Sequence, residues 1–370
     1  SGRIAAVGRS LAVPLGTHIV EAAGRPVTPG VFGGVGGLGI DETVTGDSRL
    51  TLGSPQEPQF VAEFDVTRAF NPRSFTIPIA RVEGITWTML APDAGGSFVA
   101  GQGGAVTLDG TAQVAMANSR TLFIDLGADV AALSGGSRAG QLLLLEQAIA
   151  QTRKPSSSEQ SELLSTAGRA AFRTYLDGGR VVAQVDRATD ISQCIAFAQR
   201  VGFKLVIIGG AEAWLVADEM AAAGVPVILD PLQNLPGNFD SLNARLDNAA
   251  LLQRAGVLIA FTVPNAAFDA RKILQSAGNA VTQGLDWHSA LTAVTANPAR
   301  IFGVSHLRGS IAVGKVADLV LWSGDPLDVT SVAEQVWIGG RALEMRSRQS
   351  ELRDRYLKLA EQRESLGVSK

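Results

Sequence analysis

The chain has 370 residues, 46% hydrophobic and 18% charged, a balance that allows a large buried core and excludes a disordered or fibrous protein. A net charge of −3 leaves no basic surface of the kind that binds nucleic acid, and no apolar run reaches the length of a membrane span. The only cysteine, Cys194, excludes a disulfide within the chain.

The first thirty residues alternate short apolar runs with turn residues, and the stretch 315–340 does the same. This pattern is typical of short β-strands. Because the two β-rich stretches flank a different middle, we predict one small β-sandwich domain built from both chain ends. Its expected bounds are residues 1–29 together with residues 308–345.

The middle of the chain alternates apolar strands with amphipathic helices. Strands are expected at 85–91, 121–126, 181–185, 205–208, 225–229 and 258–261, and helices at 189–201, 212–223, 240–255, 268–283 and 286–296. Near-continuous apolar strands, each followed by a helix, indicate a parallel sheet covered on its outside. We therefore predict an α/β protein with a (β/α)8 TIM-type barrel over residues 30–307.

Two polar segments stand apart from this pattern. Residues 153–162 read RKPSSSEQSE and predict a polar loop. Residues 346–370 are charged and helix-prone, which predicts a solvated C-terminal helical tail.

Residues 290–303, ALTAVTANPARIFG, lead into residues 309–320, GSIAVGKVADLV. Together they resemble the C-terminal signature of the amidohydrolase superfamily, in its imidazolonepropionase and dipeptidase-like branch, and residues 2–8, 27–30 and 212–219 are similar to other parts of that family. The resemblance implies hydrolysis of C–N bonds other than peptide bonds, with zinc or a similar divalent metal. Since family members normally begin with one or two further strands, we expect this chain to start late in the small β-domain.

The family's first barrel strand usually ends Pro-Gly-x-x-x-x-His-x-His, and the resemblance places Val35 and Gly37 at the two histidine positions. It places a third histidine near the end of the strand at 183–187 and a fourth at Gly209, and the catalytic aspartate near 261–265. No lysine stands in the strands before residue 180. Because neither valine nor glycine can donate a lone pair through its side chain, the resemblance implies a metal site without its ligands. We predict no cofactor, and without a metal no bound water is driven towards hydroxide.

Other motifs carry weaker signals. Residues 34–39 match G-x-G-x-x-G, but no long strand precedes them and no clear helix follows, so we interpret them as an altered metal loop rather than a nucleotide site. His18, His288 and His306 share no ligand spacing and are expected at the surface or in packing. Cys194 lies on an apolar helical face and is expected to be buried and inert.

Polar residues at the carboxyl ends of barrel strands are the best candidates for a pocket, because sites on this fold form there. The candidates are Gln184, Asp186, Arg187, Glu212, Asp230, Asn234, Asp269 and Arg271. The glycine-rich loop at 94–104 could present backbone N–H groups to an anion or could form a tight turn.

Two functions stay open. The first is hydrolysis of a C–N bond through carboxylates such as Asp186, Glu212 and Asp230, which would hold a harder cation or act as general acid and base. The second is a catalytically silent relative that binds a small molecule or supports an active paralogous subunit. A homo-oligomer is also possible. The resemblance leaves a periplasmic and a cytoplasmic location both open, and we expect neither a nucleic acid nor a membrane span.

Overall fold

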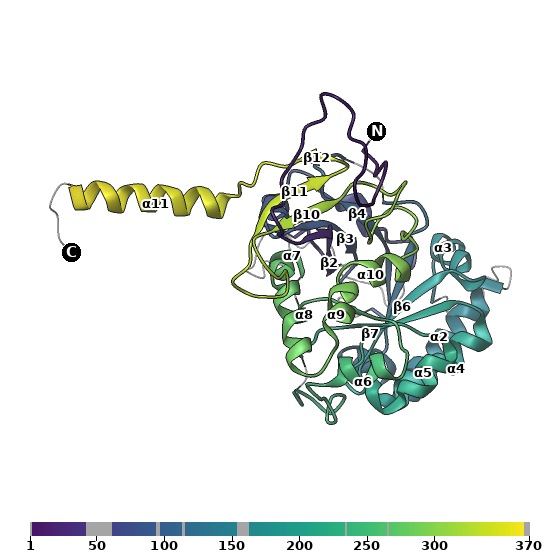
Figure 1. Cartoon of the computed structure of the whole chain (residues 1–370). Coiled ribbons are helices and arrows are strands. Elements are labelled where there is room, and N and C mark those ends of the chain that lie inside the picture. The colour runs from purple at the N-terminus through teal and green to yellow at the C-terminus, as the bar shows by residue number, and fades with distance from the viewer. Residues whose placement is uncertain are drawn as a thin grey trace.

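The computed structural model describes residues 2–41, 61–93, 97–112, 115–153, 163–233, 235–264 and 266–365. Within these ranges an eight-stranded sheet curves into a nearly closed barrel, with strands paired in the order of the sequence (Figure 1). The strands are β2 (Val31–Gly36), β3 (Ile85–Leu90), β4 (Val99–Thr107), β5 (Thr121–Asp125), β6 (Arg180–Val185), β7 (Lys204–Gly209), β8 (Val227–Leu229) and β9 (Ile259–Phe261). Every strand that the sequence predicted in the middle of the chain is present. The mixed α/β class is therefore confirmed.

Strand β4 departs from the predicted parallel order. It runs antiparallel to both β3 and β5, whereas β2 and β3 are parallel to each other and β5 to β9 form a continuous parallel run. Residues 91–98, which join β3 to β4, are too few for the crossover of roughly a dozen residues that parallel strands need. The glycine-rich segment at 94–104 was therefore misread in part: residues 99–104 belong to β4, and residues 94–96 lie outside the described ranges.

Helices cover the outside of the barrel (Figure 1). The α-helices are α1 (Thr76–Arg81), α2 (Arg138–Arg153), α3 (Thr166–Leu176), α4 (Ala188–Val201), α5 (Ala217–Ala223), α6 (Asn248–Arg254), α7 (Ala266–Asp269), α8 (Ile273–Thr282), α9 (Trp287–Ala293) and α10 (Ala296–Ile301). Short 3-10 turns are η1 (Val66–Ala69), η2 (Ala128–Ser134), η3 (Ala213–Val216) and η4 (Ala270–Lys272). The helix expected at 240–255 begins only at Asn248, because residues 235–247 form turns that begin with a Leu-Pro-Gly sequence.

The first barrel strand contacts the segments that follow the last strand through buried aromatic rings and hydrogen bonds. Phe32 of β2 packs against Trp87 of β3 with ring centroids 4.6 Å apart, and against Phe302 at 5.9 Å; all three side chains are fully buried. Along this seam the Phe32 N–H donates to the carbonyl of Val294 and the Val35 N–H to Thr262 Oγ1, at 2.9 and 3.0 Å. These contacts join the first barrel strand to the segments that follow the last one.

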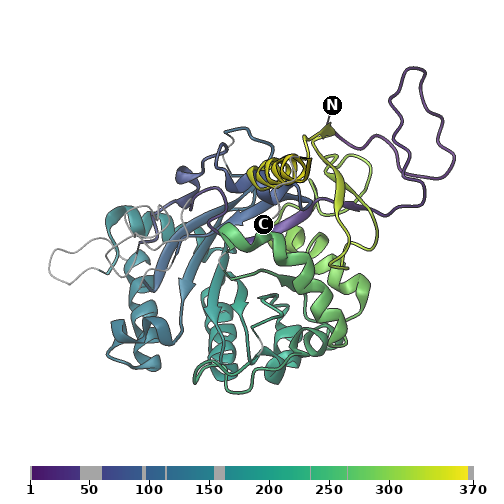
Figure 2. The same ribbon diagram turned by 90° about the vertical axis from the view of Figure 1, so that its left-hand side faces the viewer.

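Both chain ends contribute to a second sheet, as the sequence predicted. Strand β1 (Val27–Pro29) pairs with β10 (Leu319–Trp322), which pairs with β11 (Ala333–Ile338) and then β12 (Arg341–Ala342), all antiparallel. The described residues form one layer rather than the two of the predicted sandwich. Residues 5–24 run as a loop away from the body (Figure 2). The residues before this loop contact the segment before β10 through the bridge of Arg3 to Val316 and through backbone hydrogen bonds of Ile4 with Gly314 and Lys315. The domain bounds drawn from the sequence stay a prediction.

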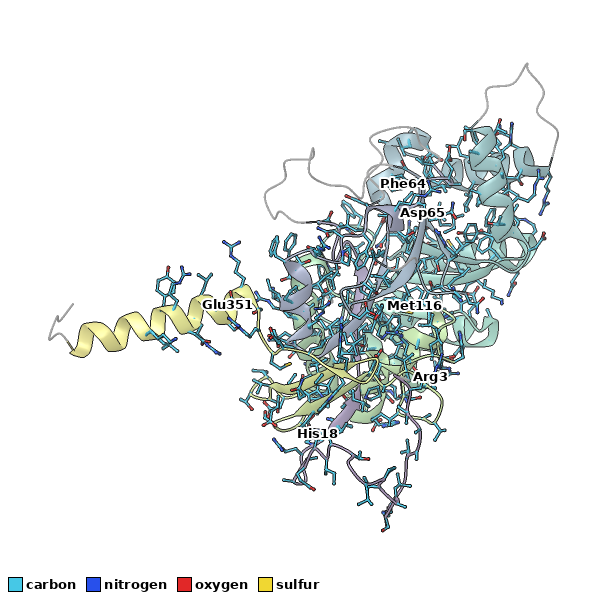
Figure 3. The ribbon with its side chains drawn as sticks, turned by 90° about the horizontal axis from the view of Figure 1, so that it is seen from above. Arg3, His18, Phe64, Asp65, Met116 and Glu351 are labelled. Carbon is cyan, nitrogen blue, oxygen red and sulfur yellow. The ribbon has the colours of Figure 1, made fainter. Side chains whose placement is uncertain are left out.

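The C-terminal tail is helical, as expected. Helix α11 (Arg348–Ser365) projects from the body, and Glu351 near its start lies on the projecting part (Figures 1 and 3). Its described side chains are mostly exposed. Among the helices of the described ranges, none combines the length and apolar character that a membrane crossing requires.

Candidate functional site

A cavity of about 500 Å³ opens at the carboxyl ends of the barrel strands. The ends of β2, β5, β6 and β7 and the segments after β8 and β9 line it, which is the face where barrel folds place their sites. Its lining residues are Val35, Gly36, Gly37, Asp41, Ala91, Pro92, Asp93, Ala100, Phe123, Ile124, Asp125, Gln184, Ile208, Gly209, Asp230, Gln233, Thr262, Val263 and Pro264.

The charged groups of this cavity are all acidic. Four carboxylates line it, from Asp41, Asp93, Asp125 and Asp230, and no Lys, Arg or His is among its described lining residues. Gln184, Gln233 and Thr262 add neutral polar groups. We call the four aspartates the acidic lining. Their charge favours a positively charged ligand over an anion.

Burial shapes the acid–base behaviour of two of these groups. Desolvation raises the pKa of Asp41, and repulsion by the Asp93 carboxylate raises it further. Burial also raises the pKa of Asp230, against the N–H of Leu232, which donates to Oδ1 at 3.0 Å and favours the charged form. Both carboxyl groups therefore hold a proton to a higher pH than an exposed aspartate does.

Asp125 is the most enclosed of the four. Its side chain is 7% exposed at the end of β5, and Oδ1 accepts the N–H of Gly127 at 3.1 Å. This hydrogen bond fixes the carboxylate at the start of the loop that leaves the strand.

Three of the four positions at which the family resemblance places metal-ligating histidines line this cavity: Val35, Gly37 and Gly209. Their common location supports the residue-by-residue matching. None of these three side chains carries a donor atom for a metal such as zinc. Among the residues with described positions, no group of three or more His, Cys, Asp or Glu side chains is arranged to hold a metal ion.

Only two of the predicted candidates lie in the cavity, Gln184 and Asp230. Asp186 instead accepts the N–H of Ala211 at 3.2 Å, and Arg187 is the exposed residue that precedes α4. Asn234 lies outside the described residues. The expectation that Asp186 and Arg187 face the cavity is not met, because side chains after a strand also serve to join neighbouring loops.

Asp269 and Arg271 lie elsewhere as well. Both line a separate hollow of about 390 Å³ beside α1 and α7. There Asp269 pairs with Lys272 at 2.8 Å, and Arg271 donates to Gln349 Oε1 at 3.2 Å. Both residues follow the last barrel strand in the sequence, but they lie on α7 and η4, away from the cavity at the strand ends.

Glu212 was predicted for the pocket but is 5% exposed and holds two loops together. Its Oε2 accepts the N–H of Ala188 at 3.1 Å, and its Oε1 accepts the backbone and side-chain N–H groups of Asn243 at 3.0 and 2.9 Å. The side chain thus satisfies donors at the start of α4 and in the turns before α6.

We expect Glu212→Ala to lower the free energy of unfolding by about 3 kcal/mol, because it leaves buried N–H groups without an acceptor. Urea denaturation measures this, with Glu219→Ala on the exposed face of α5 as the control. Equal stability of the two variants would contradict the structural role of Glu212.

The cavity also contains residues that the sequence analysis missed: Asp41, Asp93, Asp125 and Gln233. Asp125 had a signal, since it ends the predicted strand at 121–126 in the same way that Gln184 ends its own. Asp41 and Asp93 follow glycine-rich or irregular segments, where strand periodicity gives no indication of direction.

The glycine motif, the three histidines and Cys194 add no further catalytic group to this site. Gly36 and Gly37 of the G-x-G-x-x-G run line the cavity, and a turn rather than a helix follows them. His18, His288 and His306 are exposed, as expected; His18 lies on the N-terminal loop (Figure 3). Cys194 is buried, and burial raises the pKa of its thiol to about 12, so it is not a thiolate at neutral pH.

Comparison with known proteins agrees with the fold. The sequence profile of the amidohydrolase family matches residues 266–343. The amidohydrolase tasK of Hapsidospora irregularis is 35% identical over 92 residues, which make up 25% of this chain and only 9% of that protein.

Solved structures extend the likeness to nearly the whole chain. An amidohydrolase from Thermotoga maritima MSB8 is 25% identical with a TM-score of 0.82, over 93% of this chain and 94% of that one. N-isopropylammelide isopropylaminohydrolase from Burkholderia multivorans ATCC 17616 shares the fold, with 17% identity and a TM-score of 0.51 over 92% of each chain. The arrangement of barrel and second sheet is therefore that of an amidohydrolase fold. The family match over residues 266–343 and the fold of nearly the whole chain support its assignment to the amidohydrolase superfamily.

Proposed function

We propose that this protein binds a small organic cation in the cavity at the strand ends and has lost the metal-dependent hydrolysis of its superfamily. The observation that carries the proposal is the lining of that cavity. Four carboxylates line it without a cationic side chain among its described residues, while Val35, Gly37 and Gly209 stand where the family resemblance places metal-ligating histidines. We further propose that the nearly closed sheet is a variant of the (β/α)8 barrel in which β4 runs in the opposite direction.

The size and chemistry of the cavity define the ligand class. A volume of about 500 Å³ lies within the range of small-molecule sites. Phe123, Ile124 and Ile208 supply apolar contact, and the acidic lining supplies charge. A primary, secondary or quaternary ammonium compound with a compact apolar part fits this combination.

A matched ligand series tests the proposal. Binding of a primary amine, of its neutral N-acetyl derivative and of the carboxylate of equal size is measured by calorimetry at low ionic strength, where charge has its largest effect. We expect compounds of the cationic class to bind and their neutral and anionic partners not to bind. Equal binding of all three, or preference for the anion, would contradict the proposal.

A second candidate function is metal-independent hydrolysis of a C–N bond. The electrostatic coupling of Asp41 and Asp93 favours it, because two interacting carboxyl groups can divide into an acid and a base. Turnover of a cyclic amide or a dipeptide by chelator-treated protein, abolished in Asp41→Asn, would support this function over simple binding.

The raised pKa values of Asp41 and Asp230 make cation binding dependent on pH. A cation binds the deprotonated carboxylates, so we expect affinity to fall as the pH decreases through the raised pKa values of Asp41 and Asp230. The fall begins above the ordinary aspartate value of 3.8. A quaternary ammonium ligand is the correct probe, since its charge does not titrate. Constant affinity down to pH 3.8, where carboxyl groups of raised pKa are mostly protonated, would show that neither carboxylate contacts the ligand.

A further inference from the structure

The space beside Gly37 is already occupied. A Cβ atom at this position would overlap the Asp41 carboxylate, with Asp41 Cγ 2.7 Å away. Because Cγ itself is so close, turning the carboxylate about its own axis does not clear the space. The whole group would have to leave by a change at χ1.

The backbone holds Asp41 in this place. The N–H groups of Ile40 and Asp41 both donate to the carbonyl of Gly37, at 2.8 and 3.0 Å. Ile40 is 1% exposed and anchors the turn in a small apolar cluster with Val66 and Leu90. The turn therefore places the Asp41 carboxylate directly against Gly37.

Gly209 shows the same arrangement on the opposite side of the cavity. A Cβ atom there would lie 2.6 Å from Asp186 Oδ1 and 3.0 Å from Gln184 Nε2. Asp186 is held by the N–H of Ala211, and the backbone of Gly209 has a φ of +94°, which strains any side chain. Two of the family's ligand positions are thus filled by neighbouring polar side chains.

We infer that Asp41 and Asp186 occupy the space that side chains at positions 37 and 209 would need, so that a histidine cannot be accommodated at either ligand position while these carboxylates keep their places. Asp41 is thereby a determinant of what the cavity accepts. The inference rests on the proposed function only through the matching of Val35, Gly37 and Gly209 to ligand positions. It predicts that histidines at 35 and 37 do not restore a metal half-site while Asp41 is present.

A double-mutant cycle of Gly37→Ala and Asp41→Ala tests the filled space. The φ of Gly37 lies outside the left-handed region, so alanine adds crowding there without backbone strain. We expect Gly37→Ala to lower the Tm by roughly 3–8 °C in the natural chain, and by far less in the Asp41→Ala background. An equal loss of Tm in both backgrounds would overturn the inference. If Gly37→Ala alone yields no folded protein, recovery of folding by Asp41→Ala supports the inference and its absence overturns it.

Zinc binding gives a second readout. Equilibrium dialysis with zinc compares Val35→His/Gly37→His with the same pair in the Asp41→Ala background. We expect at least tenfold tighter zinc binding when Asp41 is removed, and equal or weaker binding would overturn the inference. Binding of organic ammonium compounds by the natural chain is measured separately, so failure of the proposed function and failure of this inference are distinguishable.

Discussion

Arg308→Ala is expected to lower the free energy of unfolding by about 3–5 kcal/mol, the loss typical of breaking a buried ion pair on one side. Arg308 Nη1 lies 2.8 Å from Asp318 Oδ2, and the two side chains are 8% and 3% exposed. Removal of the guanidinium leaves the Asp318 carboxylate buried with one remaining partner, the N–H of Gly339 at 2.9 Å. Burial already raises the pKa of Asp318, so loss of its cation makes the charged form still less favourable.

Urea denaturation of three variants distinguishes this effect from general damage. Arg300→Ala, at an exposed position on α10, is the control and should cost less than about 0.5 kcal/mol. The double change Arg308→Met and Asp318→Leu removes both charges, and we expect it to be less harmful than Arg308→Ala alone. A cost of Arg308→Ala equal to that of the control would contradict a stabilising role of the buried ion pair.

Asp230→Asn is expected to weaken binding of an organic cation by roughly 10- to 100-fold, the value of a hydrogen bond to a charged group. The carboxylate lies in the cavity beside a strand end and is held by the N–H of Leu232, so asparagine keeps its shape and removes only its charge. Combining the change with Asp41→Asn should weaken binding further, because the two groups belong to one acidic lining.

Asp218→Asn is the matched control, since Asp218 is exposed on α5 at the outside of the barrel. Its affinity for the same ammonium compound should equal that of the natural chain. Unchanged binding in Asp230→Asn would place the ligand outside the cavity and remove the main support for the proposed function.

The strands of the barrel were predictable because their apolar runs are bounded by turns and followed by helices. The predicted strands at 181–185 and 205–208 agree with β6 and β7 almost residue for residue. Strand β4 was not predicted, since its sequence VAGQGGAVT has the glycine content of a loop. Only pairing with β3 and β5 makes it a strand, and such pairing is not encoded in local composition.

The site was predictable in place but only partly in its residues. Gln184 and Asp230 face the cavity, whereas Glu212 and Asp186 satisfy backbone N–H groups of neighbouring loops. Sequence position alone does not distinguish a residue that lines the cavity from one that binds a loop. A carboxylate after a strand can point towards either. The turn that carries Asp41 over Gly37 depends on a buried neighbour, Ile40, and has no local signature.

The metal content of the purified protein is the measurement that most directly tests the central claim. Elemental mass spectrometry is applied before and after incubation with zinc, manganese or iron, followed by dialysis. The lining by Val35, Gly37 and Gly209 predicts transition metal well below one atom per chain in every sample. Retention of one zinc, manganese or iron atom per chain would contradict the account and point to a metal site built from Asp41, Asp125 and Asp230.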